Sequence, residues 1–206
     1  MAIREILRYP DNKLLNIAEK VKSFDESVVT LAADLRDTAA GFKAEGLAAT
    51  QVGEAVRMFV IKDTESDGYL VCVNPEILER NSEEISLREG CLSFPGVYQP
   101  IKRSTSVRVR FQDENGKVVE RWLSGINAAA FQHELDHLDG VLFIDRMGKL
   151  QKRLALKRLD KVRRKNARQL KMIEAMLNKA TRAQKVLRAE ENESTTVESA
   201  TETATF

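Results

Sequence analysis

The alternation of apolar and polar positions divides the first part of the chain into helical and extended segments. Helical spacing of apolar residues predicts three helices, at 11–22, 25–43 and 127–138. Apolar, β-branched runs predict four strands, at 58–62, 69–74, 106–112 and 117–123. The turn sequences SDG and DENG join these strands into two hairpins. Grouped strands bracketed by helices favour an α+β fold, with mixed or antiparallel sheets around a central helix.

After Gly148 the pattern becomes purely helical. Apolar residues recur at helical spacing from Leu150 to Leu187 with no glycine or proline between them, which predicts one long helix over 148–189. Residues 190–206 are rich in serine, threonine and glutamate and have no packing pattern, so we expect a disordered tail. The chain therefore divides into a mixed α and β domain at 1–147, the helix and the tail.

The net charge of +2 conceals three segments of different charge. Residues 1–147 hold 18 basic and 24 acidic side chains, residues 148–189 hold 15 and 2, and residues 190–206 hold none and 5. A helix of such positive charge is either a solvated surface or the contact site for a polyanion such as RNA. Because it carries no interleaved aromatic residues, sequence-specific recognition of nucleic acid is not indicated.

Three features favour a cytoplasmic protein. No run of about 18 apolar residues is present, which argues against a transmembrane helix. The opening segment carries Arg4, Glu5 and Arg8 where a signal peptide requires apolar residues. Two cysteines do not form a disulfide framework, so a reducing compartment and no membrane contact are expected.

Both histidines of the chain lie in one helical segment, with the sequence QHELDH at 132–137. His133 and His137 are four residues apart, so they share one helix face and can bind one metal ion. Glu134 lies between them, where its carboxylate can accept a proton from a water molecule at the metal. The alternative is a polar helix with two surface histidines.

A third metal ligand cannot be histidine, so Cys72, Cys91 or a carboxylate must supply it. Cys72 lies in an apolar strand, where a cysteine is usually an inert buried side chain. Cys91 follows Gly90, which allows close approach of the backbone, and is the favoured ligand. Three protein ligands leave a position open for catalysis. Spacing alone does not choose between zinc and ferrous iron, both of which suit these donors.

Small residues follow the second predicted helix, in the sequence AEGLAATQVG at 44–53. They predict a loop and then a short strand or turn, with close approach of the backbone to a ligand. Gln51 is either a hydrogen-bond donor to a developing oxyanion or an exposed turn residue.

These segments, with EGCLS at 89–93, occur in the order that is typical of peptide deformylases, and about residues 1–160 resemble that family. The opening MAIREILRYPD and NPEI at 74–77 are also similar. The resemblance implies removal of the formyl group from the N-terminal formyl-methionine of new bacterial polypeptides by the domain at 1–147. It implies that Cys91, His133 and His137 hold the metal, usually Fe²⁺, with Zn²⁺, Ni²⁺ or Co²⁺ able to replace it.

The resemblance also implies roles for residues around the metal. Glu134 would act as base and then as acid, and the Gln51 side chain with the Leu92 backbone N–H would stabilise the oxyanion. Gly46 would bind the substrate backbone, and Glu89 would form a supporting ion pair with Arg103. The methionine pocket would be lined by Leu87, Ile126, Ala129, Ala130 and His133. The basic helix would contact the ribosome.

Three positions depart from the family pattern. Ala44 replaces a glycine, Glu45 replaces an apolar residue near the path of the substrate, and Tyr98 stands where many relatives carry arginine. None is a metal ligand or the base, so activity should survive while peptide selectivity changes.

Two other functions compete with deformylation. A metalloprotease with an HExxH motif would cut internal peptide bonds, but it normally uses a third histidine or a downstream glutamate as ligand. A ribosome-associated binding protein with a vestigial site would need neither the complete ligand set nor Glu134.

Overall fold

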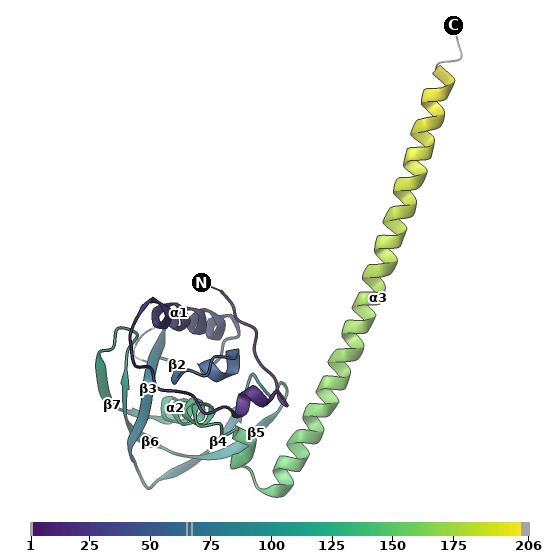
Figure 1. Cartoon of the computed structure of the whole chain (residues 1–206). Coiled ribbons are helices and arrows are strands. Elements are labelled where there is room, and N and C mark those ends of the chain that lie inside the picture. Colours follow the sequence, from purple (N-terminus) through teal and green to yellow (C-terminus); the bar gives the residue numbers. More distant parts are fainter. Residues whose placement is uncertain (1, 65, 67, 203–206) are drawn as a thin grey trace. The chain divides into compact units, whose positions relative to one another are not determined.

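A computed structural model describes the backbone of residues 2–64, 66 and 68–202, and the side chains as far as residue 178. The chain divides into two compact units, Met1–Leu159 and Asp160–Phe206. The first unit contains every strand that the structure describes and the first turns of the last helix. It has the α+β architecture that the sequence predicts, with antiparallel sheets around a central helix (Figure 1).

The larger sheet has five antiparallel strands in the order β1-β2-β3-β6-β7. Their bounds are β1 (Gly46–Ala48), β2 (Met58–Lys62), β3 (Tyr69–Arg80), β6 (Ser106–Gln112) and β7 (Val118–Ser124). The four predicted strands correspond to β2, β3, β6 and β7, with β3 extended to Arg80. β2 and β3 form one predicted hairpin, and β6 and β7 form the other. Asp67, in the turn between β2 and β3, lies outside the described residues.

The sheet separates two helices. α1 (Glu26–Gly41) has Asp25 as its N-cap, and the Asp25 carboxylate accepts a hydrogen bond from the N–H of Ser27. It packs on one face of the sheet against Met58 and Val60. α2 (Gly125–Leu138) packs on the other face, against Phe59 and Ile61. The fully apolar centre of β2 follows from this position, since both of its faces are covered.

A second sheet is the hairpin of β4 (Glu84–Gly90) and β5 (Tyr98–Ser104), which the sequence analysis did not predict. The residues of β4 are mostly exposed and rich in charge, so no apolar alternation marks the strand. α2 contacts both this hairpin and the larger sheet, and is therefore the central helix of the unit. A third cluster of apolar residues joins Phe94 to the 3-10 helix η3 (Phe143–Arg146).

The helix predicted at 11–22 is wrong. Only the short 3-10 helix η1 (Asn12–Leu15) forms there, and the chain then runs extended. Ala18 N donates to Leu138 O and Glu19 N donates to Ala55 O, so backbone N–H groups of this segment form hydrogen bonds with residues far away in the sequence. Ile17 is 73% exposed, although helical spacing assigns it to the buried face. A second 3-10 helix, η2 (Ala49–Val52), follows β1, where the sequence indicates a turn.

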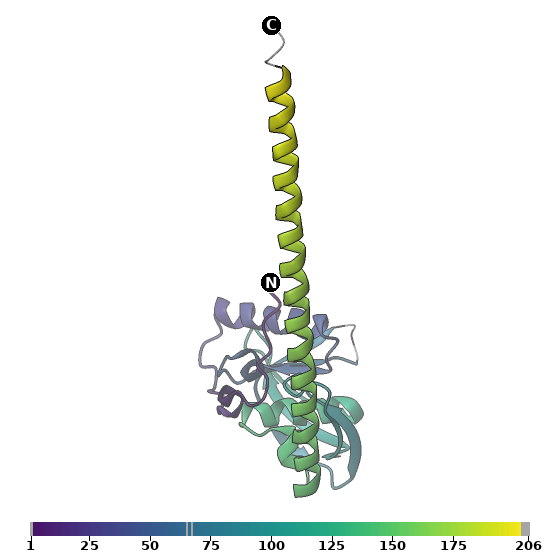
Figure 2. The ribbon, with the colours of Figure 1, turned by 90° about the vertical axis from the view of Figure 1, so that its right-hand side faces the viewer.

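The long C-terminal helix is α3 (Lys149–Glu202), drawn unbroken in Figure 2. It differs from the sequence analysis at both ends. Ala155 and Leu159 are buried in the third cluster, so the compact unit extends to Leu159 rather than to residue 147. The helix also continues past residue 189 through most of the expected disordered tail, since residues 190–202 contain no glycine or proline. Residues 203–206 lie outside the described backbone.

Candidate active site

α2 carries an unusual set of buried polar side chains. Gln132, His133, Glu134, Asp136 and His137 are all at most 8% exposed. Buried polar groups need partners or a bound ligand to offset the loss of water. Because α2 packs against strands of both sheets, its HExxH motif lies inside the molecule rather than on a solvent-exposed face.

Cys91 joins the two histidines from the end of β4. One ligand atom from each of Cys91, His133 and His137 lies within 4.8 Å of the other two, and Cys91 Sγ is 3.3 Å from His137 Nε2. A thiolate and two imidazoles at this spacing suit a transition-metal ion with an open position. The three residues fit a metal ion by donor type and by convergence.

Cys72 cannot serve as a ligand in this fold. It lies in β3 within the cluster that includes Phe59 and Phe131, and its side chain is fully buried. Burial raises the pKa of its thiol well above the ordinary value, so the thiolate that binds metals is disfavoured. The choice left open by the sequence therefore falls on Cys91.

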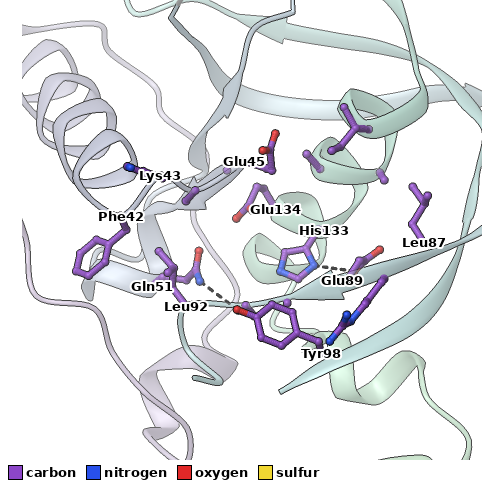
Figure 3. A pocket seen from close by; sticks show the side chains of 18 of the residues that line it. Phe42, Lys43, Glu45, Gln51, Leu87, Glu89, Leu92, Tyr98, His133 and Glu134 are labelled. Atoms are coloured by element: carbon purple, nitrogen blue, oxygen red, sulfur yellow. Dashed lines mark hydrogen bonds and ion pairs between the residues drawn. The ribbon is translucent and has the colours of Figure 1, made fainter. Parts of the chain in front are cut away.

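The predicted ion pair between Glu89 and Arg103 is confirmed. Arg103 Nε and Nη2 donate to the two carboxylate oxygens of Glu89 at 2.8 and 3.0 Å. Glu89 Oε2 also lies 2.9 Å from His133 Nδ1 (Figure 3). Burial opposes ionisation of Glu89, but its hydrogen bonds with His133 and Arg103 outweigh burial and lower its pKa. With Nδ1 engaged in this way, Nε2 is the ring nitrogen of His133 left for a metal.

Glu134 points into the same space from α2 (Figure 3). It is 4% exposed, and Oε2 has no hydrogen-bond partner among the described residues. Burial raises the pKa of Glu134 to about 7. A divalent cation on the three ligands would add positive charge nearby and lower this pKa. A buried carboxyl group with one unpartnered oxygen, next to candidate metal ligands, is a candidate proton acceptor.

Gln51 is a buried, oriented residue rather than an exposed turn residue. Its Oε1 accepts from the N–H of Ala48 at 2.9 Å, which fixes the amide plane. Its Nε2 donates to Ser93 Oγ at 3.2 Å and to Cys91 Sγ at 3.4 Å. The amide N–H group therefore faces the metal ligands, as a donor to a developing oxyanion must.

A cavity of about 710 Å³ opens beside these groups. Its lining includes every residue that the sequence analysis assigns to metal binding, catalysis or substrate binding except His137. They are Glu45, Gly46, Gln51, Leu87, Cys91, Leu92, Ile126, Ala129, Ala130, His133 and Glu134. The lining also includes residues that the sequence analysis missed, among them Arg8, Phe42, Lys43, Ile85 and Arg88. Had residues 84–90 been predicted as a strand, the alternation of its faces would have placed Ile85 and Leu87 on one face and Arg88 on the other.

The model of the polypeptide deformylase family matches residues 3–153, which is most of the chain. The chain belongs to this family. It is therefore an enzyme of the hydrolase class. A peptide deformylase of Novosphingobium aromaticivorans is 40% identical over 186 residues, covering 80% of this chain and 99% of that protein.

Solved deformylase structures match the fold as well. The peptide deformylase of Legionella pneumophila has 42% identity and a TM-score of 0.76, covering 81% of this chain and 99% of its own. The Ehrlichia chaffeensis deformylase, solved with actinonin, has 32% identity and a TM-score of 0.74, covering 80% and 98%. These relatives confirm the recognition from motifs and the α+β fold.

The departures from the deformylase pattern lie at the cavity. The Tyr98 ring lies across Gly90, where a Cβ would approach Tyr98 Cε1 to 2.5 Å, so a larger residue at position 90 would require this ring to move. The Arg88 guanidinium lies 5.3 Å from the centre of the Tyr98 ring. Ala44 O accepts a hydrogen bond of 2.6 Å from Tyr69 OH, and Glu45 is exposed. An altered peptide selectivity stays a prediction.

Among the helices that the structure describes, none combines the length and apolar character needed to cross a membrane.

Proposed function

We propose that this chain is a metal-dependent deformylase that hydrolyses the N-terminal formyl-methionyl group of nascent polypeptides. The observation that carries the proposal is the convergence of Cys91, His133 and His137 beside Glu134, whose Oε2 has no hydrogen-bond partner among the described residues. Family membership supports the substrate class. The cavity, which is lined by Cys91, His133 and Glu134, gives a peptide N-terminus access to the site.

Cys91, His133 and His137 would hold the metal, and Fe²⁺ is the ion we assign as native, with Zn²⁺, Ni²⁺ or Co²⁺ able to substitute. A thiolate with two imidazoles is a donor set that these transition metals accept. The ion supplies Lewis-acid polarisation of the formyl carbonyl and lowers the pKa of a bound water.

The peptide backbone would enter between two open strand edges. Among the described strands, β1 pairs only with β2, and β4 pairs only with β5. Gly46 on β1 and Gly90 on β4 both line the cavity. An extended peptide can hydrogen-bond to such edges, and Gly46 would contribute its main-chain groups to the substrate.

Glu134 would accept the proton of the attacking water and pass it to the departing amine nitrogen, which then leaves as the free N-terminus of the peptide. Its buried position excludes bulk water from competing for that proton. The Gln51 Nε2 and the Leu92 backbone N–H would donate to the formyl oxygen as it gains negative charge. Ala48 holds the plane of the Gln51 amide, and Nε2 would exchange its 3.4 Å contact with Cys91 Sγ for the formyl oxygen.

The methionine side chain would occupy the apolar part of the cavity. The residues assigned to this subsite are Leu87, Ile126, Ala129, Ala130 and His133. Two alanines on the helix leave room for an unbranched side chain, and a thioether packs well against aliphatic and ring surfaces. Glu45, at the exposed rim, would contact the peptide beyond the methionine.

Anaerobic deformylation tests the proposal. Freshly purified protein loaded with Fe²⁺ should release formate from formyl-Met-Ala-Ser, and should not cleave an internal peptide bond of a blocked peptide. Cleavage of the internal bond would favour the metalloprotease alternative. Absence of turnover in a sample that contains stoichiometric metal would favour a binding protein with a vestigial site.

The basic helix is the basis of a second proposal, contact with ribosomal RNA in the cytoplasm. Within the described part of the second unit, Lys161, Arg163, Arg164 and Lys165 are exposed. The repulsion among such closely spaced positive charges is reduced when they pair with RNA phosphates, and the counterions released on binding favour the complex. The two cysteines are free thiols, which suits a reducing compartment.

Ribosome co-sedimentation of the full-length chain tests this contact. Replacing Arg163, Arg164, Lys165 and Arg168 with glutamine should weaken binding and reduce its salt dependence. A matched variant replaces four exposed lysines of the first unit, Lys13, Lys20, Lys22 and Lys117, with the same change in net charge. Equal binding by both variants would refute a specific role for the helix.

A further inference from the structure

Asp136, the neighbour of the metal ligand His137, is held by two guanidinium groups. Arg103 Nη1 donates to Oδ2 at 2.6 Å. Arg146 donates through Nη2 to Oδ1 at 2.5 Å and through Nε to Oδ2 at 3.1 Å. Two parallel N–H donors on one carboxylate fix its orientation as well as its position. The sequence analysis assigned no role to either Asp136 or Arg146.

Arg103 extends this contact to the metal ligand His133. Its remaining donors hold both oxygens of Glu89, and Glu89 Oε2 in turn lies 2.9 Å from His133 Nδ1. The contacts form one continuous series, here called the Arg146 relay, through Arg146, Asp136, Arg103, Glu89 and His133. The relay ends on the ring nitrogen opposite the one left for a metal ion.

The charges of the relay are balanced and mostly buried. Side-chain exposure is 4% for Arg103, 10% for Glu89 and 11% for Asp136, against 49% for Arg146. Two carboxylates face two guanidinium groups. Without Arg146, Arg103 would be the one guanidinium group shared by both buried carboxylates, and it cannot keep its two bonds to Glu89 while replacing the lost donors to Asp136.

The segment that carries Arg146 touches His133 by a second route. Arg146 is the last residue of η3, and Phe143 is the first. The Phe143 ring lies 5.9 Å from the His133 ring, measured between centroids. One side of the imidazole is thus packed by η3, while its Nδ1 is oriented through the relay.

We propose that Arg146 is a positioning residue for the metal site, which acts through Asp136, Arg103 and Glu89 to hold His133 in the orientation that binds the metal. Arg146 is absent from the cavity lining. The inference rests on the metal site of the proposed function. It concerns retention of the metal rather than the chemistry of hydrolysis.

Metal release from the full-length, Co²⁺-loaded chain tests the proposal. Arg146→Gln should release Co²⁺ to a chelator about tenfold faster than wild type, as expected when a residue supporting a metal ligand is removed. Its visible cobalt bands should also change. The matched control is Arg57→Gln, which removes the 2.7 Å contact between Arg57 and Asp139. Asp139 is the C-cap of α2, the helix that carries His133, and it is not part of the relay.

The thermal midpoint of each variant separates positioning from loss of stability. The proposal requires fast release in Arg146→Gln and wild-type release in Arg57→Gln at comparable midpoints. Release from Arg146→Gln within twofold of wild type, or equally fast release from both variants, would overturn it. If Arg146→Gln fails to fold, Arg146→Lys keeps the charge without the paired donors, and the same outcomes apply. A wild-type chain that binds no Co²⁺ would instead refute the metal site itself.

Discussion

The backbone of Gly46 lies against the carboxylate of Glu134. A Cβ at residue 46 would be 2.6 Å from Glu134 Oε1 and 2.8 Å from its Cγ. β1 therefore approaches α2 so closely that only glycine leaves the proposed base in place. This contact joins two segments that are 88 positions apart in the chain.

Gly46→Ala should reduce deformylation while leaving the fold intact. The methyl group would push the flexible Glu134 side chain aside, and a displacement of about 1 Å at a catalytic group costs about a hundredfold in rate. The measurement is kcat/KM together with the thermal midpoint. Gly148→Ala is the control, because its Cβ would lie 3.8 Å from its nearest neighbour, Gln151 Oε1, which is an ordinary contact. An unchanged kcat/KM in Gly46→Ala would contradict the role of Glu134.

Glu134→Ala should bind metal and lose turnover. The three ligands remain, so metal content should match wild type, while loss of a general base typically lowers the rate by about 10²–10⁴-fold. Metal analysis and kcat on the same anaerobic sample check both parts. Full activity would refute the assignment of Glu134 as base.

Cys91→Ala should lose the metal. Removing the thiolate leaves two imidazoles from adjacent turns of one helix, which bind a divalent ion far more weakly. Cys72→Ala is the matched control, since that thiol is buried in the core and should affect stability rather than metal content. Normal metal content in Cys91→Ala would show that the ligand assignment is wrong.

Stability should depend on pH through Glu120 on β7. Hydrogen bonds from Arg108 and then Arg110 lower its pKa below the ordinary value of 4.5. A carboxyl whose pKa is lower in the folded than in the unfolded state stabilises the fold above the unfolded pKa, and this contribution is lost as the pH falls through the folded value. The midpoint of Glu120→Gln should therefore fall below wild type at about pH 7 and approach it at about pH 3.

Salt provides a second check of this exposed cluster. Since Glu120 and both arginines face solvent, about 1 M salt should reduce the difference in midpoint at neutral pH. A difference that persists in high salt and at acid pH would show that Glu120 stabilises the sheet by packing rather than by charge.

Local sequence patterns were sufficient to predict elements whose apolar and polar positions match their burial in the folded protein. β2 has apolar residues on both faces because α1 and α2 cover it, and its bounds coincide with the prediction. β4 has no such signature, because it is mostly exposed and pairs only with β5 among the described strands. Helical spacing at 11–22 was misleading, since Ala18 bonds to Leu138 across the fold instead of to its own turn.

The sequence by itself determined two of the candidate metal ligands and the carboxylate beside them. Only two histidines exist, their four-residue spacing brings them to one helix face, and Glu134 is fixed beside them by the same periodicity. Tertiary structure decided the remainder: that Cys91 rather than Cys72 reaches the histidines, that Gly46 touches Glu134, and that Arg146 connects to His133. These contacts join residues far apart in the chain, and such proximity follows from packing between sheets and helix, which no local periodicity encodes.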